Sequence, residues 1–83
     1  MEKRLGFVGI IVEQRETSAQ KVNNILSECG SMIVARTGLP YDKKNCSVIT
    51  LVVDCTTDQL GILTGKLGSV EGVTVKSALS KGR

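Results

Sequence analysis

Residues 47–68 read SVITLVVDCTTDQLGILTGKLG. The first nine are rich in β-branched residues and alternate a strongly apolar face with a more polar one, which is typical of a strand. The next four, Thr56-Thr57-Asp58-Gln59, form a Thr-x-x-Gln capping box, which starts a helix by giving its free N–H groups side-chain partners. An apolar stripe and a closing glycine follow at Leu60, Leu63, Leu67 and Gly68. The stretch predicts a strand that leads directly into a helix.

The same plan occurs earlier in the chain. The run LGFVGIIV, residues 5–12, is apolar on both faces, as expected of a central strand. Thr17-Ser18-Ala19-Gln20 repeats the capping box, and Gly30 is the expected end of the helix. The apolar stripe of this helix is predicted at Ala19, Val22, Ile25, Leu26 and Cys29. The two halves of the chain therefore share one supersecondary pattern.

Two further strands complete the fold. Residues 32–39, MIVARTGL, predict a strand, and Pro40 begins a polar turn that joins it to the strand at 47–55 as a hairpin. Residues 72–78, GVTVKSA, predict a short final strand. The order βαββαβ predicts an α+β, ferredoxin-like sandwich, a four-stranded antiparallel sheet with two helices on one face. Right-handed crossovers give the strand order 4-1-3-2. We expect residues 1–83 to form this single domain.

Length and composition predict a small cytoplasmic oligomer. The 83 residues carry a net charge of +3, and no stretch approaches the ~20 apolar residues of a membrane helix. The cysteines, Cys29, Cys46 and Cys55, are odd in number and follow no signal peptide, so we expect reduced thiols. This fold leaves one sheet face uncovered, and the first strand must place apolar side chains there. An exposed apolar face predicts a homo-oligomer.

Several chemistries are excluded by residues that the sequence lacks. The chain has no histidine, and its cysteines form no C-x-x-C clamp, so we expect no metal site and no cofactor. Residues 61–68, GILTGKLG, lack the spacing of a phosphate loop, and we expect Gly61 and Gly65 to let another helix or backbone approach closely. The carboxylates are scattered along the chain. We therefore expect no enzymatic activity.

Direct binding to nucleic acid is also disfavoured. RNA-recognition modules of this fold stack bases on aromatic side chains of two strands, and the only aromatic residues here are Phe7 and Tyr41. A DNA-binding regulator needs a recognition helix or ribbon, for which the predicted elements leave no residues. An influence on transcription would have to pass through a partner protein.

Two segments resemble a known family. They are Arg36-Thr37-Gly38-Leu39-Pro40 and Leu63-Thr64-Gly65-Lys66-Leu67-Gly68, the second followed by Gly72-Val73-Thr74-Val75-Lys76. They resemble the iron-only hydrogenase system regulators, and the likeness covers essentially the whole chain. That family is similar to ACT domains and to the C-terminal domain of nickel-responsive repressors. The resemblance implies a dimeric or tetrameric regulatory module that modulates the assembly or expression of iron-only hydrogenase.

Two groups of residues are candidates for binding an effector. The first lies at the start of the first helix, where free N–H groups and the helix dipole suit a carboxylate or phosphate: Arg15, Thr17 and Ser18. The second would form another wall if subunits pair through the second strand: Arg36, Thr37 and Gly38. The alternative is that Thr17 and Ser18 only cap the helix and that Arg36 only blunts an edge strand.

The leading hypothesis is a cytoplasmic, homo-oligomeric module that senses a ligand and regulates the iron-only hydrogenase system without catalysis. Its small-molecule site is expected at the subunit interface. The alternative is an adaptor that senses nothing and binds a partner protein through an exposed sheet edge. A pocket at the subunit interface lined by Arg15, Thr17 or Arg36 would favour the sensor, whereas a dry interface without a pocket would favour the adaptor.

Overall fold

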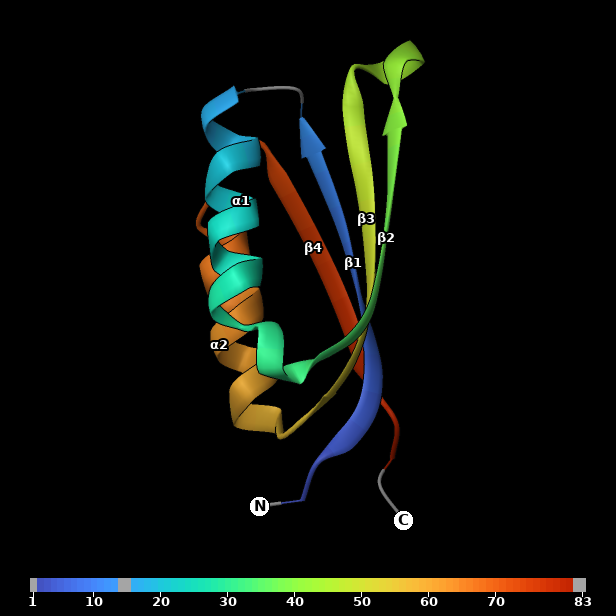
Figure 1. The fold of residues 1–83 in the computed structure, drawn as a ribbon, viewed down its shortest axis with the longest axis vertical. Coiled ribbons are helices and arrows are strands. Elements are labelled where there is room, and N and C mark those ends of the chain that lie inside the picture. The colour runs from blue at the N-terminus through green and yellow to red at the C-terminus, as the bar shows by residue number, and fades with distance from the viewer. Residues whose placement is uncertain (1, 14–15, 82–83) are drawn as a thin grey trace.

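A computed structural model describes residues 2–13 and 16–81 of the chain (Figure 1). Its strands are β1 (Arg4–Glu13), β2 (Ile33–Tyr41), β3 (Cys46–Cys55) and β4 (Val73–Leu79). Its helices are α1 (Glu16–Glu28) and α2 (Thr57–Gly68), with short 3-10 turns η1 (Gly30–Met32) and η2 (Asp42–Lys44). The predicted βαββαβ order is confirmed.

The four strands form one antiparallel sheet in the order β2-β3-β1-β4, which is the predicted 4-1-3-2 order counted from the opposite edge. At the centre of the sheet Gly9 of β1 pairs with Thr50 of β3 and with Lys76 of β4. Both helices lie on one side of the sheet, and the other side is bare (Figure 1). The predicted ferredoxin-like sandwich is confirmed.

The core lies between the sheet and the two helices. Strand alternation turns every second side chain of β1 and β3 toward the helices. These buried side chains are Val8, Ile10, Val12, Ile49, Leu51, Val53 and Cys55. Val22 and Leu26 of α1 and Leu63 and Leu67 of α2 close the core from the other side. Each large apolar side chain buried in this way contributes about 1.5–3 kcal/mol of transfer free energy.

The two predicted capping boxes behave differently. The box before α2 is confirmed: Gln59 N–H donates to Thr56 Oγ1 (3.1 Å), and Thr56 N–H donates to Gln59 Oε1 (2.9 Å). The box before α1 is wrong, because α1 begins at Glu16 and Thr17 already lies inside its first turn. Ser18 is buried, and its hydroxyl donates to the backbone carbonyl of Glu71 (2.7 Å) instead of capping the helix.

The hairpin between β2 and β3 is longer than predicted. Pro40 and Tyr41 belong to β2 and pair with Ser47 and Cys46. Proline is tolerated there because β2 is an edge strand, one side of which needs no ladder partner. The turn is η2, closed by Asn45 in the left-handed conformation (φ 55°), which asparagine adopts more readily than most residues.

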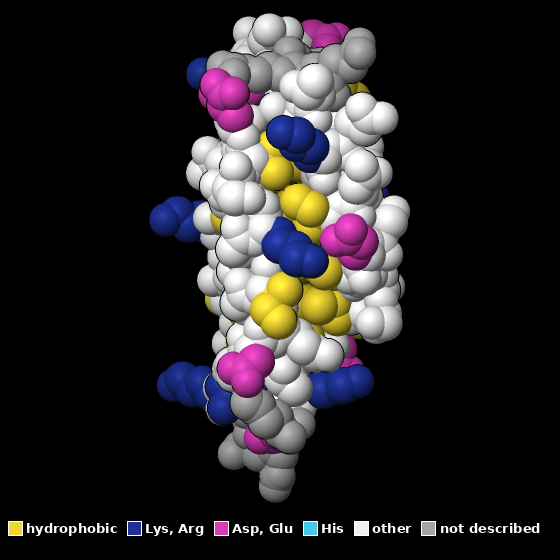
Figure 2. Space-filling model, turned by 90° about the vertical axis from the view of Figure 1, so that its left-hand side faces the viewer, with side chains coloured by type: hydrophobic (Ala, Val, Ile, Leu, Met, Phe, Trp, Pro, Cys, Tyr) yellow, Lys and Arg dark blue, Asp and Glu magenta, His cyan; other side chains and the backbone are white. Residues whose placement is uncertain are grey.

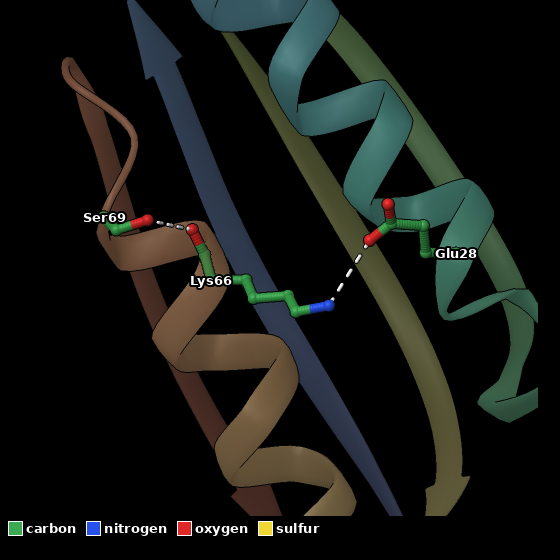
Figure 3. A network of polar contacts seen from close by, with 3 residues as sticks. All are labelled: Glu28, Lys66 and Ser69. Atoms are coloured by element: carbon green, nitrogen blue, oxygen red, sulfur yellow. Dashed lines mark hydrogen bonds and ion pairs between the residues drawn. The ribbon is translucent and has the colours of Figure 1, made fainter.

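The helix layer is joined at its surface by polar contacts. From the helix side, hydrophobic side chains form a strip between the helices, with Lys and Arg side chains over it (Figure 2). Lys66 Nζ of α2 reaches Glu28 Oε1 of α1 (3.3 Å), and Ser69 Oγ donates to the Lys66 carbonyl (2.7 Å; Figure 3). Such an exposed ion pair stabilises a fold by only ~0–1 kcal/mol.

The glycines of α2 do not serve the packing role predicted for them. A Cβ placed on Gly61 or Gly65 would meet no heavy atom of the chain within 4 Å. Both residues are exposed, so no helix or backbone of the described residues approaches them closely. None of the helices in residues 2–13 and 16–81 is long and apolar enough to span a bilayer.

Candidate ligand pocket beside the edge strand

The two helices leave one strand of the sheet uncovered. Arg36 and Gly38 of β2 pair with Leu51 and Ile49, whose side chains face the core, so both residues lie on the helix side of the sheet. They are nevertheless exposed. The helix layer therefore ends before it reaches the outer part of β2, and a gap remains between α1 and this edge of the sheet.

This gap forms a pocket of about 340 Å³. Buried Val12 and Ile49 contribute apolar surface from β1 and β3. Ala19 and Asn23, four residues apart on α1, line the helix side, since that spacing puts two residues on one helix face. The strand side includes Gly38 and Pro40, and Ser47 and Glu13 add polar groups. The volume lies within the usual range of ~300–1,000 Å³ for ligand sites.

Small side chains keep this pocket open. Gly38 lines the pocket and a Cβ on it would meet no heavy atom within 4 Å, so a larger residue there would take up pocket space. Ala19 was predicted to join the apolar stripe of α1, but it is exposed and lines the pocket instead. The prediction was wrong because helical spacing identifies a face, whereas burial depends on whether the sheet extends beneath that face.

Arg36 connects the two sides of the pocket. Its Nη2 donates a hydrogen bond to Asn23 Oδ1 (2.8 Å), which links the edge strand to α1. A guanidinium carries five N–H donors, and this bond uses one of them. Arginine binds carboxylates and phosphates through paired donors. The pocket thus combines an apolar surface with a cation suited to a small anionic group.

The structure brings together only part of the predicted effector site. Arg36 and Gly38 both line the pocket. Thr37 pairs with Thr50 and lies on the opposite face of the sheet. Thr17 is exposed in the first turn of α1 and does not line the pocket, and Ser18 is bonded to Glu71 on the side toward β4. Arg15 lies outside the described residues.

Sequence reasoning missed Asn23, Ala19 and Ser47. The one available signal was the polar residue Asn23, four positions after a small residue on the predicted first helix. A small and a polar residue four positions apart indicate a side of the helix that is not packed in the core, but they do not show which element lies opposite it.

Few groups in the structure are equipped for metal or thiol chemistry. Within residues 2–13 and 16–81, no three His, Cys, Asp or Glu side chains are grouped to hold a metal ion. Burial, and secondarily the charge of Asp54, raise the pKa of the Cys55 thiol above its ordinary value, which favours the unreactive protonated form. Cys29 and Cys46 are half-buried free thiols.

Comparisons with known proteins identify relatives. A model of the family described as “TM1266-like: Iron-only hydrogenase system regulator, putative” matches residues 4–77. The chain is similar to the solved structure of uncharacterized protein TM1266 from Thermotoga maritima, with 39% identity, a TM-score of 0.94, and 96% of this chain and 100% of that chain covered. No curated protein matches the chain.

Two more distant structures are similar in fold. The ACT domain of GTP pyrophosphokinase from Chlorobium tepidum has 23% identity and a TM-score of 0.76, with 92% of this chain and 99% of that chain covered. The C-terminal domain of the MgtC protein from Mycobacterium tuberculosis has 16% identity and a TM-score of 0.73, with 95% and 89% covered. The predicted ACT-like fold is confirmed.

Proposed function

The chain belongs to the TM1266-like family of iron-only hydrogenase system regulators, and on this premise we propose that it is a cytoplasmic, homo-oligomeric module that regulates the hydrogenase system by sensing a small molecule. The proposed module is one domain spanning residues 1–83 and has no catalytic activity of its own. The observation that carries the proposal is the pocket between α1 and β2, where Arg36 lies beside an apolar surface.

The pocket favours a small ligand with an apolar body and an anionic group. Val12 and Ile49 offer apolar contact, and the Arg36 guanidinium offers charge-assisted hydrogen bonds. Such a ligand would compete with Asn23 for Arg36 or add to that contact, and would change how β2 is held against α1. Ligand binding to the folded state alone would also stabilise the module by mass action.

Regulation without catalysis is supported by the side chains available. The sequence contains no histidine to act as a base, and the charged groups in the pocket lining are one carboxylate, Glu13, and one guanidinium, Arg36. We therefore propose that the ligand is bound and released unchanged. Its effect would pass to the hydrogenase system through a partner protein.

Native mass spectrometry of the protein purified from its own host tests the sensing proposal. We expect a stoichiometric small molecule on the wild type and its loss in Gly38→Leu, because leucine at 38 would occupy the pocket. Gly61→Leu is the matched control, since Gly61 is an exposed glycine with equal free space, far along the chain on α2. If the Gly38→Leu variant still retained the molecule, the pocket between α1 and β2 would not be its binding site.

A wild-type protein with nothing bound would contradict the sensor and favour an adaptor. The adaptor would have to use a sheet edge, and the two edges differ. A register shift between Ile33 and Ala35, together with Pro40, interrupts β2 and protects it from strand addition. The outer edge of β4 is the more suitable one, and cross-linking from Lys76 would identify a partner bound there.

A further inference from the structure

The bare face of the sheet collects most of the exposed apolar surface of the described chain. Phe7 and Ile11 of β1 point away from the helices, and Phe7 is 58% exposed. Val52 of β3 lies beside Phe7, and Leu39 and Tyr41 extend the apolar surface onto β2. At the Ala78 end of this face, Phe7 and Val52 border an apolar hollow of about 400 Å³. Contiguous apolar surface of this kind marks an interface.

Gly9 leaves a notch at the centre of this face. It lies between Phe7 and Ile11 on the central strand, opposite Thr50 and Lys76. A Cβ at Gly9 would meet only the Lys76 carbonyl, at 4.0 Å, and its backbone is not in the left-handed region that favours glycine. A Cβ at Gly6, by contrast, would collide with the Ala78 carbonyl oxygen. The chain itself therefore requires glycine at 6 but not at 9.

A glycine inside a central strand weakens the strand and commonly marks the close approach of a ligand or another backbone. Nothing within the described chain except the Lys76 carbonyl comes within 4 Å of a Cβ at Gly9, which leaves room there for a group from another molecule. The projecting side chains of Phe7 and Ile11 and the notch at Gly9 lie on the same face of the sheet. Two copies of this face, related by a two-fold axis, can therefore place the projecting side chains of each copy at the notch of the other, since a two-fold interface pairs a surface with itself.

The size of the molecule supports a second copy as the occupant. The accessible surface is 5463 Å², against about 4,800 Å² expected for a folded monomer of 8.9 kDa. The body measures 41 × 19 × 17 Å, so its long face is comparable to the ~800 Å² that each partner contributes to a standard interface. A peptide or a small ligand would leave much of this face uncovered.

We propose that two copies of this chain pack sheet against sheet, with Phe7 and Ile11 of each copy fitting around the Gly9 notch of the other. This inference rests on the homo-oligomer of the proposed function and gives that oligomer its interface. The arrangement leaves the Arg36 pocket on the outer, helix side of the sheet, so each protomer would keep its own ligand site, away from the subunit interface at which the sequence pattern led us to expect one.

Sedimentation velocity over a range of protein concentrations tests the interface. We expect a dimer whose dissociation constant rises at least ~30-fold in Phe7→Glu, as for a central interface side chain. Ile62→Glu is the matched control, because Ile62 of α2 is 57% exposed, nearly as much as Phe7, but lies in the helix layer. We expect the control to change the constant by less than about threefold.

Gly9→Leu is a second variant that fills the notch, since its Cβ would meet only the Lys76 carbonyl, at 4.0 Å. Circular dichroism shows whether each variant is folded. If folded Phe7→Glu and Gly9→Leu both dimerise as strongly as the wild type, or if only Ile62→Glu weakens the dimer, the proposed interface is wrong but the homo-oligomer of the proposed function still stands. If the wild type sediments as a monomer, both the interface and the homo-oligomer are wrong. Ligand retention in the native mass spectra is read separately, so sensing is judged independently of assembly.

Discussion

Ser18 is 3% exposed near the start of α1, and its hydroxyl donates to the Glu71 carbonyl just before β4. Replacing Ser18 with alanine should lower the free energy of unfolding by ~1 kcal/mol, because a tertiary hydrogen bond is lost and no water can replace it easily. Urea denaturation measures the change. Ser27→Ala, an exposed serine on the same helix, should change stability by less than about 0.5 kcal/mol. An equal loss in both variants would count against the Ser18 bond.

Cys55 makes the stability of the molecule depend on pH. Burial, then the Asp54 carboxylate, raise the pKa of its thiol above the ordinary value of 9.0. Above that pH the unfolded chain loses the thiol proton while the folded chain keeps it, so stability falls as pH rises. The stability advantage of the wild type over Cys55→Ala should shrink between about pH 8 and pH 10, with a slope of at most about 1.4 kcal/mol per pH unit. Urea denaturation at both pH values measures it, and a constant difference would contradict the prediction.

Among the elements, α2 depends most clearly on a local signal. Thr56→Ala should cost ~1 kcal/mol, because the Gln59 N–H loses its acceptor, the Thr56 hydroxyl, although the backbone N–H at position 56 can still donate to Gln59 Oε1. Thr57→Ala is the matched control, since Thr57 is exposed at the first position of the helix and makes no cap. Thermal unfolding of the two variants should separate them by several degrees. Coincident melting curves would show that packing of Leu63 and Leu67, rather than the cap, determines where α2 starts.

The comparison of the two Thr-x-x-Gln segments shows how far the sequence could predict the elements. The spacing located both helices and all four strands, because hydrophobic periodicity reflects burial directly. It could not distinguish a cap from a threonine in the first turn, since Thr17 and Thr56 share the Thr-x-x-Gln spacing although only Thr56 caps its helix. It also ended β2 before Pro40, because local rules do not identify which strand will be an edge.

The candidate site was predictable only in part for a related reason. Arg36 and Gly38 were recognised as candidates, but Thr37 between them must face the other way once the segment forms a strand. Asn23 meets Arg36 only because α1 stops short of the edge of the sheet. The separation between a helix layer and an edge strand is a property of packed elements, and no single segment of the sequence encodes it.

At the scale of the whole molecule, the bare sheet face follows from the double-sided apolar pattern of β1. Phe7 and Ile11 alternate with the buried Val8 and Ile10. The side chains on one face of β1 are therefore buried in the core, whereas those on the other face can be buried only by contact outside this core. An 83-residue domain has a small core, so burial of this second face would supply stability that the protomer lacks. Assembly and folding should therefore be coupled.

This coupling predicts a melting temperature that depends on protein concentration. If the dimer unfolds to two separated chains, a tenfold rise in concentration should raise Tm by about 4 °C, using typical enthalpies per residue for two chains of this length. Differential scanning calorimetry over a wide range of concentrations measures the slope. Phe7→Glu should lower the slope to near zero and reduce Tm, because its protomers unfold independently, whereas Ile62→Glu should keep the wild-type slope. A wild-type Tm that does not vary with concentration would mean that the sheet face contributes nothing to folding and that Phe7 is merely tolerated at the surface.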